Sequence, residues 1–168
     1  MVHSEVSIRR HFLSKKEVKA LLRKIEWLNS SLRELLRQGI EEAIINDRRT
    51  IVHKGSIILI ELEDGTIIPS LKLLYKQRDL VGVFPRVFVD KGAVPHIING
   101  ANIMAPGVTK VEGEFREGDI VVVVAEDYNA PICVGRAVHS SDEVKSLRKG
   151  KVVVNLHHLK DKYWSTSF

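Results

Sequence analysis

Hydrophobic residues recur at helical spacing in the first part of the chain. The repeating positions are Val18, Leu21, Leu22, Ile25 and Leu28, and this period is typical of an amphipathic helix with one buried face. Ser14 and Glu17 come just before the repeat at the spacing of a capping box, in which each side chain accepts a hydrogen bond from the other residue's amide. The sequence therefore predicts a helix that begins after Ser14. The lysines and arginines on its other faces are read as solvated side chains, with phosphate binding as the alternative.

Shorter apolar segments follow, separated by turn residues. A second helix is predicted from a further set of apolar residues at helical spacing. Residues 29–31 can cap its N-terminus, and Gly39 is expected to end it. Strands are predicted at residues 5–8, with continuation through Arg10 as an alternative, and at 43–46, 50–53, 56–62 and 66–68. Turns are predicted at 47–49, 54–55 and 64–65. Another helix is predicted to begin at Pro69 and Ser70. Together these elements predict one small α+β layer, and residues 77–85 are read as its connection to a second domain.

The second half of the chain is predicted to form a small sheet of short strands. A continuous valine-rich run covers residues 120–125, and further strands are predicted at 86–90, 131–138 and 151–157. Ser140 or Ser141 is placed to cap a short helix that ends before Gly150. Short strands joined by glycine turns favour a barrel, because closure removes exposed sheet edges.

Composition narrows the class of protein. The 168 residues, 44% of them hydrophobic, suffice for one domain or two small ones. The longest apolar runs are about six residues, too short to cross a bilayer, and the first residues lack the apolar region of a secretory signal. A single cysteine, Cys133, excludes an internal disulfide and a cysteine-rich zinc site. We expect a cytoplasmic protein that binds no membrane.

The net charge of +5 permits a nucleic-acid partner without requiring one, since ordinary surface charge explains it equally well. Residues 87–108 are more informative, because three glycines and two prolines in that stretch specify the shape of the backbone. Lys91 stands beside Gly92 at a predicted strand-to-helix turn. A mobile cation and an accessible backbone at such a turn suit a phosphate group better than bond-breaking chemistry.

Several separated motifs resemble the PUA domain, the pseudo-barrel RNA-binding module of pseudouridine synthases and archaeosine transglycosylases. They are VDKGA at 89–93, NGANIMAPG at 99–107, EGD at 117–119 before the valine-rich strand, and CVG at 133–135. They occur in the order of the family and cover residues 85 to about 159. The resemblance implies a pseudo-β-barrel that holds structured RNA.

Two flanking motifs are similar to the malignant-T-cell-amplified-sequence family. They are PSLKLLYK at 69–76 and NLHHLKDKYW at 155–164. The resemblance implies an α+β protein in which an α/β pre-PUA domain, residues 1–84, packs on a PUA domain, residues 85–168. It implies association with the small ribosomal subunit and tRNA in initiation, reinitiation or recycling. It also implies an initiation-factor-one-like protein partner on the pre-PUA domain.

The family's RNA face, carried over by position, gives the first set of candidate site residues. They are Asp90, Lys91, Gly92, Ala93, Gly100, Ala101, Asn102, Met104, Ala105, Pro106 and Gly107. A glycine at position 92 would in addition leave amides at the helix start accessible to an anion. For Gly100 and Gly107 the alternative is that they serve only the corners of the barrel.

Further basic residues could extend this footprint. They are Lys110, Arg116, Arg136, Arg148, Lys149 and Lys151. Each alone is more often a solvated side chain, and the cluster at 148–151 is the best candidate because three charges fall within four positions.

No catalytic, metal or cofactor site is predicted. His157 and His158 are neighbours on a strand, so their side chains should face opposite ways and cannot easily share one ion. Cys133 in an apolar strand is read as a packing residue. Tyr163 and Trp164 either stack on bases or cover the seam between domains. We therefore expect a non-enzymatic RNA-binding protein of translation; the alternative is an accessory subunit that delivers tRNA or guide RNA to a modification enzyme.

Overall fold

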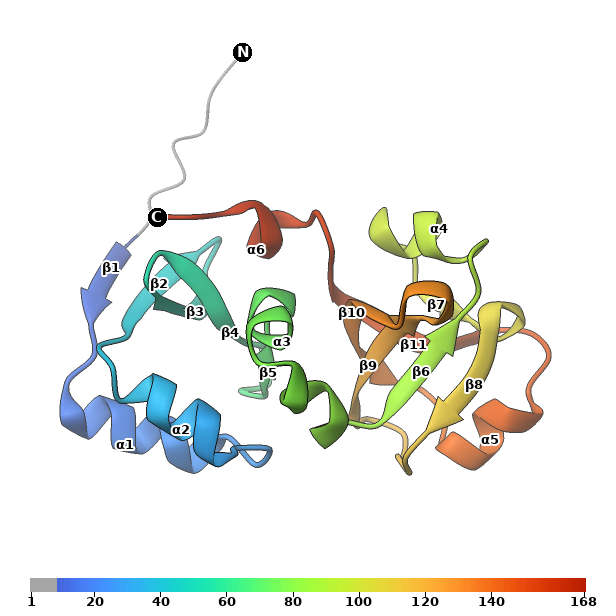
Figure 1. Ribbon diagram of the computed structural model, residues 1–168, viewed down its shortest axis with the longest axis horizontal. Coiled ribbons are helices and arrows are strands. Elements are labelled where there is room, and N and C mark those ends of the chain that lie inside the picture. Colours follow the sequence, from blue (N-terminus) through green and yellow to red (C-terminus); the bar gives the residue numbers. More distant parts are fainter. Residues whose placement is uncertain (1–8) are drawn as a thin grey trace, which may run out of the picture. The chain divides into compact units, whose positions relative to one another are not determined.

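The computed structural model describes residues 9–168, which divide into two compact units (Figure 1). The first unit runs to Pro69 and takes in Thr166–Phe168, and the second is Ser70–Ser165. Residues 70–84, assigned to the first domain from the sequence, thus group with the second unit. The division at residue 84 stays a prediction about the functional domains. No helix among residues 9–168 is long and apolar enough to cross a membrane.

The helices of the first unit begin where their caps place them. In α1 (Lys15–Lys24) the Ser14 hydroxyl accepts the Glu17 N–H at 3.2 Å, while Glu17 Oε1 accepts the Ser14 N–H at 3.2 Å. This confirms the predicted capping box. In α2 (Ser30–Leu36) the cap is Asn29, whose Oδ1 accepts the Leu32 N–H at 2.8 Å. Both helices lie on the same side of the unit's sheet (Figure 1).

That sheet is an antiparallel meander of five strands in chain order. They are β1 (Arg9–Phe12), β2 (Glu41–Ile45), β3 (Arg48–His53), β4 (Ser56–Glu61) and β5 (Ile67–Pro69). Leu32 and Leu36 of α2 and Ile57 and Leu59 of β4 are fully buried. The strand predicted at residues 5–8 lies outside the described residues.

One predicted turn is wrong in its position. The turn between β2 and β3 consists of Asn46 and Asp47, both with positive φ, and Arg48 and Arg49 already belong to β3. Asn and Asp tolerate the left-handed conformation that a two-residue hairpin requires. Arg49 forms ion pairs with Glu42 of β2 and, at 3.0 Å, with Glu61 of β4, so it bridges three strands.

The second unit opens with helical segments and continues with a curled sheet. Its elements before the sheet's long hairpin are α3 (Leu71–Lys76), η1 (Arg78–Val83), β6 (Arg86–Val89), α4 (Val94–Ile98), β7 (Ile103–Met104), η2 (Ala105–Gly107) and β8 (Val108–Glu112). The remainder are β9 (Ile120–Ala125), η3 (Glu126–Tyr128), β10 (Ala130–Ala137), α5 (Ser141–Ser146), β11 (Lys151–His158) and α6 (Lys162–Ser165). The expected linker at 77–85 is therefore mostly a 3-10 helix, and it is anchored by the buried side chains of Leu80 and Phe84.

The strand order is β7-β11-β10-β9-β6-β8. The two outermost strands, β7 and β8, are joined in the chain by η2 alone, so the sheet curls back on itself around a valine-rich core. Val87, Val121, Val123 and Val152 are fully buried there. The predicted α+β class with a PUA-type pseudo-barrel is confirmed.

The pairing of β6 with β9 is parallel, whereas the other pairs of this sheet in the described chain are antiparallel. Val89 lies opposite Ala125, and both residues end their strands. In a parallel pair, the segments that leave the two strand ends emerge at the same edge of the sheet. The loop at residues 90–93 and the turn η3 are therefore neighbours.

Candidate nucleic-acid interface

Three segments far apart in the sequence are joined by backbone hydrogen bonds into one surface, which we call the loop face and define as residues 90–93, 100–107 and 148–151. The Asp90 N–H donates to the Gly107 carbonyl at 2.9 Å, and the Ala105 N–H donates to the Gly150 carbonyl at 2.8 Å. In the β7–β11 pair Met104 lies opposite Lys151. Most of the sequence-predicted site residues thus come together.

The loop at residues 90–93 is organised by Asp90. Its Oδ1 accepts the Ala93 N–H at 2.9 Å, and the Ala93 N–H also points to the Asp90 carbonyl at 3.2 Å. The Ala93 amide, one of those expected to be open to an anion at the helix start, is therefore used inside the loop. Lys91, whose side chain is exposed, is the cation that this loop presents to solvent.

Gly100 and Gly107 serve different purposes. Gly100 has φ +97°, a left-handed conformation that other residues adopt only with strain. Gly107 has no such φ, but a Cβ added to it would lie 3.0 Å from the Cβ of Ala93, so it permits the close approach of η2 to the loop at 90–93. Turn geometry accounts for the first glycine and packing for the second.

Asn155 of β11 holds the loop at residues 100–102, and sequence reasoning missed this role. Its backbone N–H donates to Asn102 Oδ1 at 3.0 Å, and its Nδ2 donates to the carbonyls of Ile97 and Ala101 at 3.0 and 2.9 Å. The signal in the sequence was an asparagine that directly follows three valines, Val152–Val154. The Asn155 side chain thus provides, where the chain leaves α4, hydrogen bonds that backbone pairing would otherwise supply.

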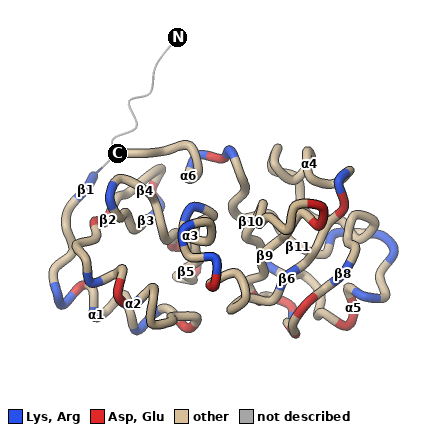
Figure 2. Tube along the Cα trace, in the orientation of Figure 1, with Lys and Arg blue, Asp and Glu red and all other residues tan. Residues whose placement is uncertain are grey.

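The loop face is mostly exposed, and its charged side chains are mostly basic. Met104 is 49% exposed, Pro106 is exposed, and Ala105 is buried beneath them. Lys91, Arg148, Lys149 and Lys151 are exposed. Basic residues follow this side of the second unit from the loop before α4 to the turn after α5 (Figure 2). Cations around an accessible backbone suit a phosphate chain.

Two predicted residues are held elsewhere by their contacts. Arg136 in β10 donates from Nη1 to the Gly118 carbonyl at 2.9 Å. Lys110 in β8 places Nζ 4.3 Å from the centre of the Phe88 ring and 3.4 Å from Glu112 Oε1.

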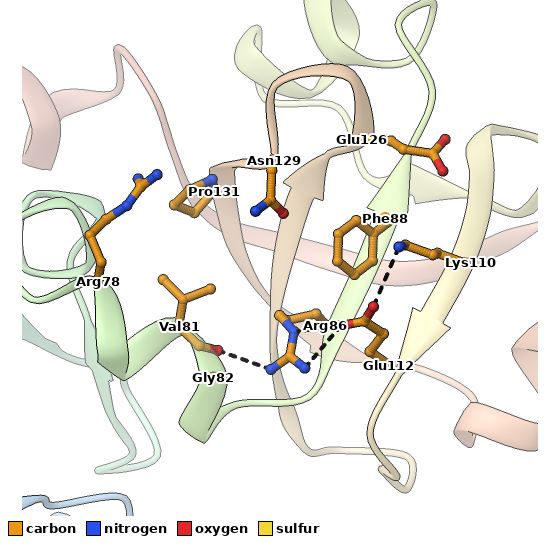
Figure 3. Close-up of a pocket in the computed structure, with 10 residues that line it drawn as sticks. All are labelled: Arg78, Val81, Gly82, Arg86, Phe88, Lys110, Glu112, Glu126, Asn129 and Pro131. Atoms are coloured by element: carbon orange, nitrogen blue, oxygen red, sulfur yellow. Dashed lines mark hydrogen bonds and ion pairs between the residues drawn. The ribbon is translucent and has the colours of Figure 1, made fainter.

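Lys110 belongs to a broad cavity of about 650 Å³ between η1, β6, β8 and η3 (Figure 3). Within it the Arg86 guanidinium donates to Glu112 at 3.0 Å and to the carbonyls of Val81 and Phe84 at 3.2 and 2.7 Å. Hydrogen bonds from Arg86, opposed by burial and aided by Lys110, lower the pKa of Glu112. The Arg86 guanidinium is thus used in hydrogen bonds with its neighbours. Arg78 lies on the side of the cavity opposite Lys110.

The described residues contain no group of three His, Cys, Asp or Glu side chains that could hold a metal ion. His157 is fully buried and His158 is partly exposed, as expected for neighbours on a strand. Cys133 is fully buried, and burial raises the pKa of its thiol.

The aromatic residues of α6 are packed. Tyr163 is buried with its ring centre 5.8 Å from that of His157, and Trp164 contacts Tyr75 edge-to-face at 5.8 Å. Both contacts lie within the second unit. Packing is thus a role that the structure assigns to both rings.

Comparisons with known proteins agree with this fold. Residues 85–159 match the PUA domain model. The chain is 38% identical to an uncharacterized protein of Methanocaldococcus jannaschii (94% of this chain, 96% of the relative). It is 30% identical to translation machinery-associated protein 20 of Eremothecium gossypii (97% and 90%).

Malignant T-cell-amplified sequence 1-B of Xenopus laevis is 32% identical over 66% of this chain and 61% of its own length. A crystal structure of a hypothetical protein from Pyrococcus horikoshii superposes with a TM-score of 0.75 at 34% identity, covering 93% of this chain and 98% of that one. The chain therefore belongs to the family of translation machinery-associated protein 20 and the malignant T-cell-amplified sequence proteins, with a PUA domain at residues 85–159.

Proposed function

We propose that this protein is a non-enzymatic RNA-binding protein that contacts the small ribosomal subunit and tRNA during translation initiation, reinitiation or recycling. The observation that carries the proposal is the loop face, in which backbone hydrogen bonds bring Lys91 together with the basic turn at residues 148–151. Family membership supports the link to translation.

The chemistry of the loop face suits RNA recognised by shape. Its cations are mobile and exposed, so they pair with phosphates without reading sequence. The exposed backbone around Gly100 and Asn102 allows close approach to ribose hydroxyls, which distinguish RNA from DNA. Because each phosphate contact releases counterions, affinity should fall steeply as salt rises.

Sedimentation with purified small ribosomal subunits tests the proposal. The double variant Lys91→Glu, Lys149→Glu should weaken cosedimentation and flatten the dependence of log affinity on log salt by about one unit per lost phosphate contact. The control is the double variant Lys16→Glu, Lys19→Glu, which replaces two exposed lysines of α1 with the same total change in charge. Equal losses in both variants would assign binding to net charge and overturn the role of the loop face.

Crosslinking the protein to RNA in cells, followed by sequencing, separates the proposal from the accessory-subunit alternative. Recovery of small-subunit ribosomal RNA and tRNA supports a role in translation. Recovery of precursor tRNA or guide RNA without ribosomal RNA would favour delivery of RNA to a modification enzyme and overturn it.

We further propose that residues 1–84 bind an initiation-factor-one-like protein. Strand β1 at the edge of the five-stranded sheet supports this, since Phe12 on that strand is 69% exposed and sheet edges pair readily with a partner's strand. Phe12→Glu should weaken capture of such a partner in a binding assay and leave ribosomal RNA binding unchanged.

A further inference from the structure

A small cavity lies where the parallel strands β6 and β9 end. Its volume is about 190 Å³. The buried Val89 and Ala125 form its floor, and Val94 and Pro95 complete its apolar lining. Cavities that take a whole small molecule are larger, about 300–1,000 Å³. This one suits a single flat ring system with an apolar face.

The rim of the cavity is polar and carries both positive and negative charges. Lys91 stands on the side of the loop face, and Glu126, Asp127 and Tyr128 of η3 stand on the other. Tyr128 is 79% exposed, although an aromatic ring usually gains stability by burial. The turn that carries it is fixed, because Asn129 takes the left-handed conformation and donates its N–H to the Glu126 carbonyl at 3.3 Å.

We propose that this cavity binds one unpaired nucleobase of the RNA that lies on the loop face. The ring would rest on the apolar floor and against Tyr128, and Lys91 would pair with the adjoining phosphate. Stacking on an exposed aromatic ring is how proteins hold single-stranded bases. The inference rests on the proposed RNA-binding function and adds a site to it.

The carboxylates of η3 give the site a preference among bases. Glu126 and Asp127 accept hydrogen bonds, so they suit bases whose Watson–Crick edge carries an amino group, such as cytosine, adenine and guanine. Uracil presents on that edge only the N3–H donor between two carbonyl oxygens, and these oxygens would face the carboxylates unfavourably. The same carboxylates disfavour a bare phosphate in the cavity, so they also select the base over the backbone.

The cavity also connects the loop face with the broad cavity of Figure 3. Glu126 lines both cavities, and the larger one contains Arg78 and Lys110. A strand whose base enters the small cavity therefore has cations on both sides of η3 for its next phosphates. This placement gives Lys110 a role in RNA binding without making it part of the loop face.

Fluorescence anisotropy with RNA hairpins tests the site. One hairpin is blunt, and others carry a four-nucleotide overhang of cytidines or of uridines. The wild-type protein should bind the cytidine overhang more tightly than the uridine overhang and the blunt hairpin. Tyr128→Ala should weaken binding of the cytidine overhang about tenfold, because the base loses its stacking contact, and leave the blunt hairpin unaffected.

Two further variants separate the contributions. The double variant Glu126→Gln, Asp127→Asn should reduce the discrimination between cytidine and uridine, because amides also donate hydrogen bonds. Val83→Ala, which shortens an exposed apolar side chain of η1, is the control and should leave the binding of all three hairpins unchanged.

The outcomes distinguish the two proposals. Equal affinity of the wild-type protein for all three hairpins, unchanged in Tyr128→Ala, would overturn the base site while the RNA-binding function stands. Absence of binding to every hairpin, together with absence of cosedimentation with ribosomal subunits, would overturn both.

Discussion

Leu71, the first residue of α3, donates its backbone N–H to Nε2 of His157 at 2.9 Å. The other ring nitrogen, Nδ1, lies 2.7 Å from Asp161 Oδ2. Because Nε2 accepts a hydrogen bond, the proton of the neutral imidazole is on Nδ1, which donates to Asp161. A fully buried histidine thus links the start of α3 to β11 and to the turn before α6, and both of its nitrogens are used for structure.

Replacing His157 should destabilise the second unit. His157→Ala leaves the Leu71 N–H without its acceptor, removes one of the donors to the mostly buried Asp161 carboxylate and opens a cavity, so we expect a loss of about 2–4 kcal/mol. Urea unfolding followed by circular dichroism measures it. His158→Ala is the matched control, and because that ring is partly exposed it should cost about 1 kcal/mol or less. Equal losses in the two variants would contradict the link.

Asp161 should make stability depend on acid pH. Burial opposes its charge, but the hydrogen bonds from His157 and from the backbone of Trp164 and His158 prevail and lower the pKa below its ordinary value of 3.8. Between the two pKa values the unfolded chain binds more protons than the folded one, so stability rises with pH there. The contribution is complete above about pH 4 and is lost as pH falls through the folded pKa.

Urea midpoints measured from pH 5 down to pH 2.5 test this dependence. Asp161→Asn should be less stable than the wild type at pH 5, and the difference should shrink as pH falls. Glu126→Gln removes a carboxylate on an exposed turn, so it should leave the acid profile unchanged. A constant difference between wild type and Asp161→Asn at all pH values would contradict the assignment.

Local signals in the sequence predicted most of the elements. The capping box at Ser14 and Glu17, the caps at Asn29 and Ser140 and the valine-rich run before Ala125 depend on neighbours in the chain, so they can be read without the structure. The turn at Asn46 and Asp47 was misplaced because charged residues next to a hairpin look like turn residues until their cross-strand partners are known.

The pairings that build the candidate site could not be predicted in this way. The parallel contact of Val89 with Ala125 places η3 beside Lys91, and nothing near either residue in the sequence signals it. The same is true of the hydrogen bond from Ala105 to Gly150. The site residues were drawn from a resemblance, and their convergence depends on these long-range pairs.

Cys133 should be unreactive in the folded protein. Its thiol is fully buried, and burial together with the charge of Asp161 raises its pKa, so the reactive thiolate is scarce at neutral pH. We expect negligible modification by a thiol reagent such as dithionitrobenzoate in buffer and one equivalent in denaturing urea. Rapid modification without denaturant would show that β10 opens readily, and would contradict its place in the core.

Gly135 should be the glycine least tolerant of a side chain. It lies at a register shift between β10 and β11, where an added Cβ would be 2.4 Å from Val153 Cγ1 and 2.6 Å from the Val154 carbonyl. Since one of these atoms is backbone, the strands must move, and Gly135→Ala should lower the free energy of unfolding by about 2–3 kcal/mol. Urea unfolding measures the loss.

Gly82→Ala is the matched control for this substitution. Gly82 is exposed in η1, has no positive φ, and an added Cβ meets nothing within 4 Å. Because alanine restricts the unfolded chain more than glycine does, this variant should be neutral or more stable by up to about 1 kcal/mol. If Gly135→Ala were as stable as Gly82→Ala, β10 and β11 would have to separate at their register shift without cost, and the close packing of the curled sheet at this point would be refuted.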